Sequence, residues 1–200
     1  RSPMPRIIHD YMGLSAGVMA LFDSPAECER LMAVIEESDA AAFELIAKCP
    51  GRLAIFGDNV DNMSVSPDLY RRYSLPYYQR KSEFLHAAGK TVLCHMDGRL
   101  QGLLPLVRET GIDVLDGITP EPMNDFSVDE LAAALGENQF AWAGVPSSMF
   151  CAAATRSEVV DCARQLIEKL GDRLILNVGD QLPPDADISL VEAVTELVNA

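Results

Sequence analysis

Three residues of the sequence could together bind a divalent metal ion. His95 and Asp97 lie two positions apart at the end of a short apolar run, and Asp180 follows a similar run later in the chain. Because alternate residues of a strand project from the same face, His95 and Asp97 are expected to point to the same side. One imidazole and two carboxylates resemble the facial ligand set of divalent metals with open coordination positions. The sequence therefore predicts a metal centre of His95, Asp97 and Asp180, with zinc as the expected ion.

The same motif has a structural interpretation, in which His95 is a hydrogen-bonded core histidine and Asp97 caps the next helix. The distribution of the other polar residues favours a functional site. Acidic residues follow four of the apolar runs, whereas the starts of these runs carry mainly glycine and basic residues. In parallel α/β folds, ligands bind beyond the carboxyl ends of the strands. We therefore expect Asp58 and Glu121 to face a substrate at this edge, next to the predicted metal ligands.

Five short apolar runs are predicted to be strands. They are nearly continuous in hydrophobic residues and do not alternate with polar ones, which is typical of strands that are buried on both faces. The predicted strands cover residues 53–57, 91–95, 114–117, 140–143 and 174–178.

Capping sequences and glycines mark the helices between these runs. Three of the caps are predicted capping boxes, with glutamate three positions after the serine or threonine. The predicted caps are Ser24, Ser127 and Thr155 as capping boxes, Ser66 before a proline, and Asp185 or Asp187 for the last helix. That last helix is expected to end near Val198. Glycines expected to follow helix ends stand at positions 89, 111, 136 and 171.

This alternation of strands and helices predicts right-handed parallel crossovers. Two architectures fit it, an open doubly wound sheet and a barrel, and the sequence has neither a Gly-x-Gly-x-x-Gly dinucleotide fingerprint nor a P-loop. The predicted strands are fewer than the eight of a closed barrel. Either the sheet is open or the chain is a piece of a longer protein, and its start at Arg1, within a loop-to-helix stretch, favours a piece. The unpaired edge of such a piece is expected to be covered by a partner chain or by a terminus.

Charge and hydropathy exclude several classes of protein. The 200 residues carry 30 acidic and 16 basic side chains, and the net charge of −14 argues against nucleic-acid binding. No apolar run approaches the roughly 20 residues of a membrane-spanning helix. Five cysteines without a C-x-x-C pair are typical of reduced thiols in a cytoplasmic protein. We expect one domain over residues 1–200 and a small-molecule substrate. The Arg71-Arg72 pair is expected on a helix face that is either exposed or the contact of a homodimer.

Several separated motifs occur along the chain in a recognisable order. They are Gly57-Asp58-Asn59, Ser66-Pro67, Leu75-Pro76-Tyr77, residues 86–90, His95-Met96-Asp97-Gly98, Gly144-Val145-Pro146 and residues 176–185. Together they resemble the uroporphyrinogen decarboxylase superfamily, which also contains cobalamin-linked methyltransferases. The resemblance spans nearly the whole chain, as the C-terminal three-fifths of such a protein. It implies a (β/α)8 TIM barrel of the uroporphyrinogen decarboxylase type, of which this chain holds the C-terminal five or so strands.

Two chemistries diverge within this superfamily. Its decarboxylases carry a Gly-His-Gly-like motif where this chain has Gly179-Asp180-Gln181. They also carry a Tyr-Met-Gly motif that Tyr11-Met12-Gly13 resembles. For this branch the resemblance implies Tyr11 and Asp58 at the pocket of a metal-free enzyme. Such an enzyme would decarboxylate uroporphyrinogen in tetrapyrrole biosynthesis.

The methyltransferase branch holds zinc with a His-x-Cys motif and a later cysteine. His95 matches the histidine, while Asp97 and Asp180 stand where the thiolates would be. An oxygen-rich site is better suited to an ether or alcohol oxygen than to a thiol. The resemblance therefore implies methyl transfer from a small O-methyl donor to a corrinoid that a partner protein carries. The alternatives are the decarboxylase and a barrel without catalytic activity that serves as a scaffold.

Overall fold

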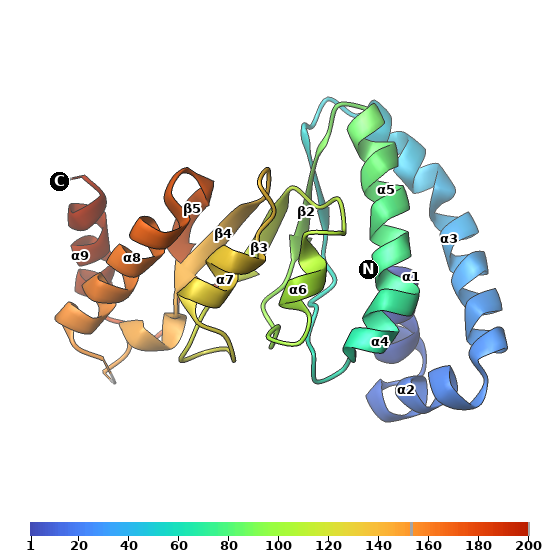
Figure 1. Cartoon of the computed structure of the whole chain (residues 1–200), viewed down its shortest axis with the longest axis horizontal. Coiled ribbons are helices and arrows are strands. Elements are labelled where there is room, and N and C mark those ends of the chain that lie inside the picture. Colours follow the sequence, from blue (N-terminus) through green and yellow to red (C-terminus); the bar gives the residue numbers. More distant parts are fainter. Residues whose placement is uncertain (153, 200) are drawn as a thin grey trace.

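The computed structural model of the chain describes residues 1–152 and 154–199. At its centre lies one parallel sheet, in which five strands are neighbours in sequence order (Figure 1). The strands are β1 (Leu53–Phe56), β2 (Thr91–His95), β3 (Val114–Ile118), β4 (Phe140–Val145) and β5 (Leu174–Val178). A doubly wound sheet reverses its strand order at a switch point, and this sheet does not. The order is therefore that of a strand–helix barrel, and the predicted strands are confirmed with small shifts at their ends.

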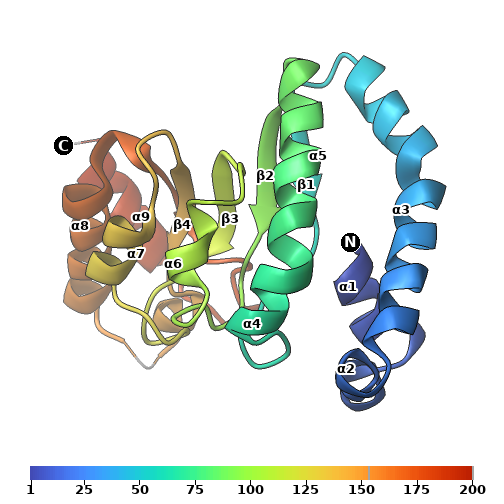
Figure 2. The ribbon, with the colours of Figure 1, turned by 45° about the vertical axis from the view of Figure 1, so that its right-hand side comes forward.

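Helices connect the strands and cover the sheet. The longer ones are α2 (Leu14–Asp23), α3 (Pro25–Lys48), α5 (Leu75–Ala87), α7 (Val128–Ala134), α8 (Arg156–Leu170) and α9 (Ile188–Val198). Short turns of helix are α1 (Pro3–Pro5), α4 (Pro67–Leu69), α6 (Leu104–Val107), the π-helical Arg6–Tyr11 and Tyr70–Ser74, and the 3₁₀ segments Ser147–Phe150 and Gly171–Arg173. Helix α5 packs on β2 and α8 packs on β4 and β5, while α3 is the outermost element beside β1 (Figure 2). Among the described residues, none of the helices has the length and apolar character that crossing a bilayer requires.

The structure tests the predicted helix caps one by one. Both halves of the capping box are present at Ser127 and at Thr155, Ser66 accepts a hydrogen bond from the amide of Leu69, and Asp187 caps α9. The capping box at Ser24 is wrong, because its side chain makes no cap hydrogen bond. Its ψ of 55° departs from the extended conformation of the other serine and threonine caps, so the hydroxyl does not reach the first turn of α3.

One face of the sheet packs against helices and the other remains open. On β1, Ala54 and Phe56 are buried, whereas Leu53 and Ile55 are 63% and 59% exposed. The strand register places Leu53 and Ile55 on the same face as His95, because Ile55 pairs with Leu93 of β2. This open face corresponds to the interior of a barrel, and its carboxyl edge carries the predicted site.

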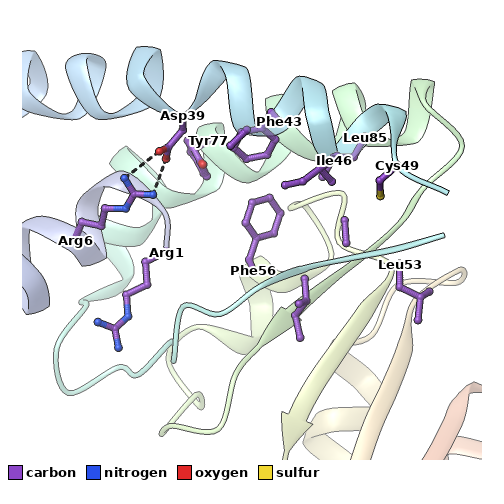
Figure 3. Close-up of a pocket in the computed structure, with 13 residues that line it drawn as sticks. Arg1, Arg6, Asp39, Phe43, Ile46, Cys49, Leu53, Phe56, Tyr77 and Leu85 are labelled. Carbon is purple, nitrogen blue, oxygen red and sulfur yellow. Dashed lines mark hydrogen bonds and ion pairs between the residues drawn. The ribbon is translucent and has the colours of Figure 1, made fainter. Parts of the chain in front are cut away.

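A groove lies between α3 and the open edge of β1 (Figure 3). Its volume is about 420 Å³, and Phe43 and Ile46 of α3 face Phe56 of β1 across it. An ion pair joins Arg6 Nη2 to Asp39 Oδ2 at 2.7 Å at one end of the groove. No strand of the described residues pairs with this edge of β1. That a partner chain or a terminus covers it stays a prediction.

Phenol and thiol groups in the interior make the free energy of unfolding depend on pH in the alkaline range. Burial raises the pKa of Tyr70, Tyr78 and Cys94 well above their usual values, and it raises the pKa of Cys162 to about 11. The folded chain therefore holds these protons more tightly than the unfolded chain, and its free energy of unfolding falls as the pH rises. We expect full stability at neutral pH and a progressive loss above about pH 9, the usual pKa of the Cys162 thiol.

Urea unfolding at several pH values, followed by the fluorescence of Trp142, measures this dependence. The substitution Cys162→Ala removes one of the contributing groups, and it should flatten the loss between pH 9 and pH 11, the usual and the raised pKa of this thiol. A free energy of unfolding that stays constant across this range would contradict the prediction.

Candidate metal centre

The structure brings the three predicted metal ligands together. His95 ends β2, Asp97 follows two residues later, and Asp180 follows β5. His95 Nε2 lies 3.7 Å from Asp97 Oδ2 and 3.9 Å from Asp180 Oδ1. One ligand atom from each residue lies within 4.8 Å of the other two. The spatial prediction is thus confirmed, while the role of these residues as ligands stays a prediction.

The approach of Asp180 to His95 depends on the backbone after β5. Gly179 donates its amide to the carbonyl of Val145 at 2.9 Å, and a Cβ at Gly179 would lie 2.7 Å from Thr119 Oγ1. Only glycine allows this close packing of the loops after β3, β4 and β5. Asp180 itself adopts a φ of +46°, in the left-handed region that costs energy for a residue with a side chain. The chain therefore holds this carboxylate at the mouth in a conformation that local preference does not favour.

A third acidic residue contacts the imidazole from its other side. Asp116 of β3 pairs with His95 in the strand register, and its Oδ2 lies 2.9 Å from His95 Nδ1. The next residue, Gly117, has a φ of +74°, and a Cβ there would lie 2.6 Å from His95 Cε1. No pattern in the sequence assigns a role to Asp116, because the register between β2 and β3 is not visible in it.

The electrostatics of this cluster favour a cation. The side chains of His95, Asp97, Asp116 and Asp180 are partly buried, with exposed fractions between 19% and 39%. Among the described residues, the ion pairs of these three carboxylates are all with His95 and none is with lysine or arginine. Three carboxylates around one imidazole leave excess negative charge in a partly desolvated site. A divalent cation would neutralise two of these three negative charges.

The distances also fit a metal ion after a small adjustment. With ligand bonds of about 2.1 Å, neighbouring ligand atoms stand about 3.0 to 3.4 Å apart in octahedral or tetrahedral geometry. The separations of 3.7 and 3.9 Å from His95 Nε2 therefore need to shorten by about 0.3 to 0.9 Å. One nitrogen and two carboxylate oxygens form a harder donor set than thiolates, and zinc accepts it.

Two residues of the loop after β3 hold the loop that carries Asp97. Asn124 Nδ2 donates to the carbonyls of Thr119 at 2.8 Å and of Asp97 at 3.3 Å. Asp125 Oδ1 accepts hydrogen bonds from the amides of Leu100 and Gln101 at 2.9 and 3.1 Å. These side chains join the loops after β2 and β3 and thereby help to place Asp97. No signal in the sequence singled them out.

The three residues predicted to act on substrate differ in their burial and in their contacts. Asp58 is buried at 1% exposure, and its two oxygens accept hydrogen bonds from the amide of Ser2 at 2.6 Å and from Tyr78 Oη at 2.5 Å. Tyr11 is 57% exposed at the end of Arg6–Tyr11, and Glu121 is exposed in the loop after β3. In the described part of the chain, none of the three forms a hydrogen bond or ion pair with the metal ligands. Their catalytic roles stay predictions.

The bond between Tyr78 and Asp58 predicts a stability effect. The substitution Tyr78→Phe removes a donor from a buried carboxylate and should lower the free energy of unfolding by about 1.5–3 kcal/mol. Tyr70 provides a matched control, because its buried hydroxyl has no hydrogen-bond partner among the described residues. The substitution Tyr70→Phe should therefore leave stability unchanged or raise it. Equal effects of the two substitutions in urea unfolding would contradict this account.

The site lies on a chain whose sequence matches a known family. The family model described as uroporphyrinogen decarboxylase (URO-D) matches residues 10–200. The chain belongs to the URO-D family. No curated protein matches the sequence of this URO-D family member.

A solved structure supports the same fold. The methyltransferase from Methanosarcina mazei superposes with a TM-score of 0.71 at 14% sequence identity, over 94% of this chain and 55% of that chain. At this identity the likeness shows the fold alone. The URO-D family chain thus spans about half the length of that structure, and its five parallel strands form a partial TIM barrel of the URO-D type. The predicted fold class is confirmed, and both the family and this neighbour are enzymes.

Proposed function

We propose that this URO-D family chain carries the metal centre of an enzyme that transfers a methyl group from a small O-methyl donor to a corrinoid. The observation that carries the proposal is the convergence of His95, Asp97 and Asp180, with one ligand atom of each within 4.8 Å of the others. These residues lie at the carboxyl ends of β2 and β5, which β3 and β4 separate in the sheet. Their meeting at the carboxyl edge, where α/β barrels bind their substrates, supports a functional role.

The proposed reaction transfers a methyl group from the oxygen of the donor to the cobalt of the corrinoid. The donor C–O bond breaks, and the methyl carbon forms a bond to the cobalt of a reduced corrinoid, which supplies the electron pair. The donor oxygen keeps the pair of the broken bond, takes up a proton and leaves as an alcohol or phenol. A bound zinc ion supplies Lewis acidity toward that oxygen.

The chain's own residues supply the shape and charge of this site. His95, Asp97 and Asp180 would hold the ion with one nitrogen and two oxygens, and three protein ligands would leave coordination capacity for a donor molecule. Two negative ligands leave a divalent ion without net charge, so a neutral ether or alcohol suits the site. A partner protein that presents the corrinoid follows from the methyltransferase branch of the family.

Decarboxylation of uroporphyrinogen is the second candidate within this family. It would use Asp58 and Tyr11, without a metal, and carboxylates would stabilise a protonated pyrrole. The carboxylate of Asp58 is buried and already accepts two hydrogen bonds from the protein. That arrangement favours the first proposal. A barrel that serves only as a scaffold is the third candidate.

Metal analysis and activity assays distinguish these candidates. The chain is stripped with a chelator and titrated with zinc by calorimetry, and we expect one zinc ion to bind per chain. With cob(I)alamin and 2-methoxyphenol, methylcobalamin formation should require the zinc, as followed by absorbance. A correctly folded protein without zinc affinity would rule out the metal step. Metal-independent release of carbon dioxide from uroporphyrinogen would establish the decarboxylase, and absence of both activities would favour the scaffold.

A further inference from the structure

We infer that Asp116 is a positioning residue that directs Nε2 of His95 toward the metal site. This inference rests on the proposed function and goes beyond it, because it assigns a role to a residue outside the three ligands. Asp116 Oδ2 lies 2.9 Å from His95 Nδ1. The other ring nitrogen, Nε2, lies 3.7 Å from Asp97 Oδ2 and 3.9 Å from Asp180 Oδ1. The two ring nitrogens therefore have different partners.

The chemistry of these partners determines the tautomer of His95. A neutral imidazole has one N–H donor and one nitrogen with a free lone pair, and an ionised carboxylate can only accept. The short contact with Asp116 therefore places the proton of a neutral ring on Nδ1. The lone pair then belongs to Nε2, which is the atom that a metal needs. Histidine ligands commonly donate their second N–H to such a carboxylate.

The backbone fixes Asp116 relative to the ring. Residues 95 and 116 are register partners on β2 and β3, and Met96 donates its amide to the carbonyl of Asp116 at 2.8 Å. Gly117 completes the arrangement, since a Cβ at this position would collide with the imidazole. Asp116 thus holds the ring from β3, with Nε2 on the side of Asp97 and Asp180.

The same chain contains a matched control for this contact. His86 Nε2 lies 2.8 Å from Asp113 Oδ2, where β3 begins, and this pair lies at the opposite edge of the sheet. The substitutions Asp116→Asn and Asp113→Asn remove the same charge from the same kind of pair. Only the first should change zinc binding.

Two measurements test the inference. Zinc titration of Asp116→Asn should give an affinity about 10- to 100-fold lower than wild type, and Asp113→Asn should match wild type. Nitrogen-15 NMR of the histidine rings in the metal-free wild-type chain, at a pH where His95 is neutral, should show the proton on Nδ1. In Asp116→Asn this preference should weaken or reverse, which a purely structural role would not cause.

The outcomes separate this inference from the proposed function. A wild-type chain that does not bind zinc overturns the metal proposal, whereas the NMR tautomer still tests the Asp116 contact. Zinc affinity of Asp116→Asn equal to that of wild type, with an unchanged tautomer, overturns the positioning role alone. If Asp116→Asn does not fold, the wild-type spectrum decides, because a proton on Nε2 would contradict the inference without any variant.

Discussion

Replacement of Asp180 by alanine is expected to weaken zinc binding by at least about 100-fold, because loss of a direct ligand exceeds the 10- to 100-fold effect of an outer-shell partner. The substitution leaves His95 and Asp97 as the only ligands of the three. It does not relieve the left-handed backbone conformation, because alanine also has a Cβ and tolerates this region less well than aspartate. Calorimetric titration of the chelator-treated variant measures the affinity, and circular dichroism confirms that the variant is folded.

Asp185 provides the control for this substitution. It is an exposed carboxylate in the same loop between β5 and α9, five residues after Asp180. The substitution Asp185→Ala changes the net charge equally and removes no predicted ligand, so zinc affinity should stay at the wild-type value. A similar loss in both variants would show that the effect is general electrostatics and not coordination, and the assignment of Asp180 would be wrong.

Replacement of Phe126 by alanine is expected to lower the free energy of unfolding by about 3–5 kcal/mol, the typical cost of a cavity left by a buried aromatic ring. Phe126 is fully buried, and its carbonyl accepts a hydrogen bond from the amide of Glu121 at 2.9 Å. It therefore anchors the loop whose Asn124 and Asp125 hold the loop of Asp97. Zinc affinity should fall together with stability, because this support loosens.

Met123 of the same loop is the matched control for Phe126. Its side chain is 42% exposed, so Met123→Ala should cost less than about 1 kcal/mol and should not change zinc affinity. Urea unfolding and zinc titration of both variants provide the comparison. If Phe126→Ala lost stability but bound zinc as well as wild type, the loop after β3 would not support the metal ligands.

Much of the fold could be predicted from the sequence because its signals are local. The apolar runs gave strands β2 and β5 with their observed ends, and the capping boxes at Ser127 and Thr155 begin helices as predicted. The exception is Ser24, which also ends the preceding helix α2. Its sequence contains the capping pattern, but the turn between α2 and α3 sets a ψ at which the hydroxyl cannot cap.

In the candidate site, too, some features follow from local sequence and others require the tertiary structure. The shared direction of His95 and Asp97 follows from the two-residue period of a strand, so the spacing alone predicted it. The contact of His95 with Asp116 requires the register between β2 and β3, which no short segment encodes. The burial of Asp58 against Tyr78 likewise depends on how α5 packs over the strands. The sequence shows only that Asp58 follows a strand, and this position suggested a substrate contact.

Local sequence patterns were sufficient to predict which segments form strands and helices, which residues follow each strand, and the resemblance to the URO-D family. Each of these depends on side chains within a few positions of one another, where backbone preferences and capping act. The packed fold was needed to show that Asp180 meets His95, that Asp116 holds the imidazole and that Asp58 is buried. These contacts join residues that are 20 to 85 positions apart in the chain. Their geometry depends on strand register, sheet curvature and close glycine contacts, which arise only when the whole sheet assembles.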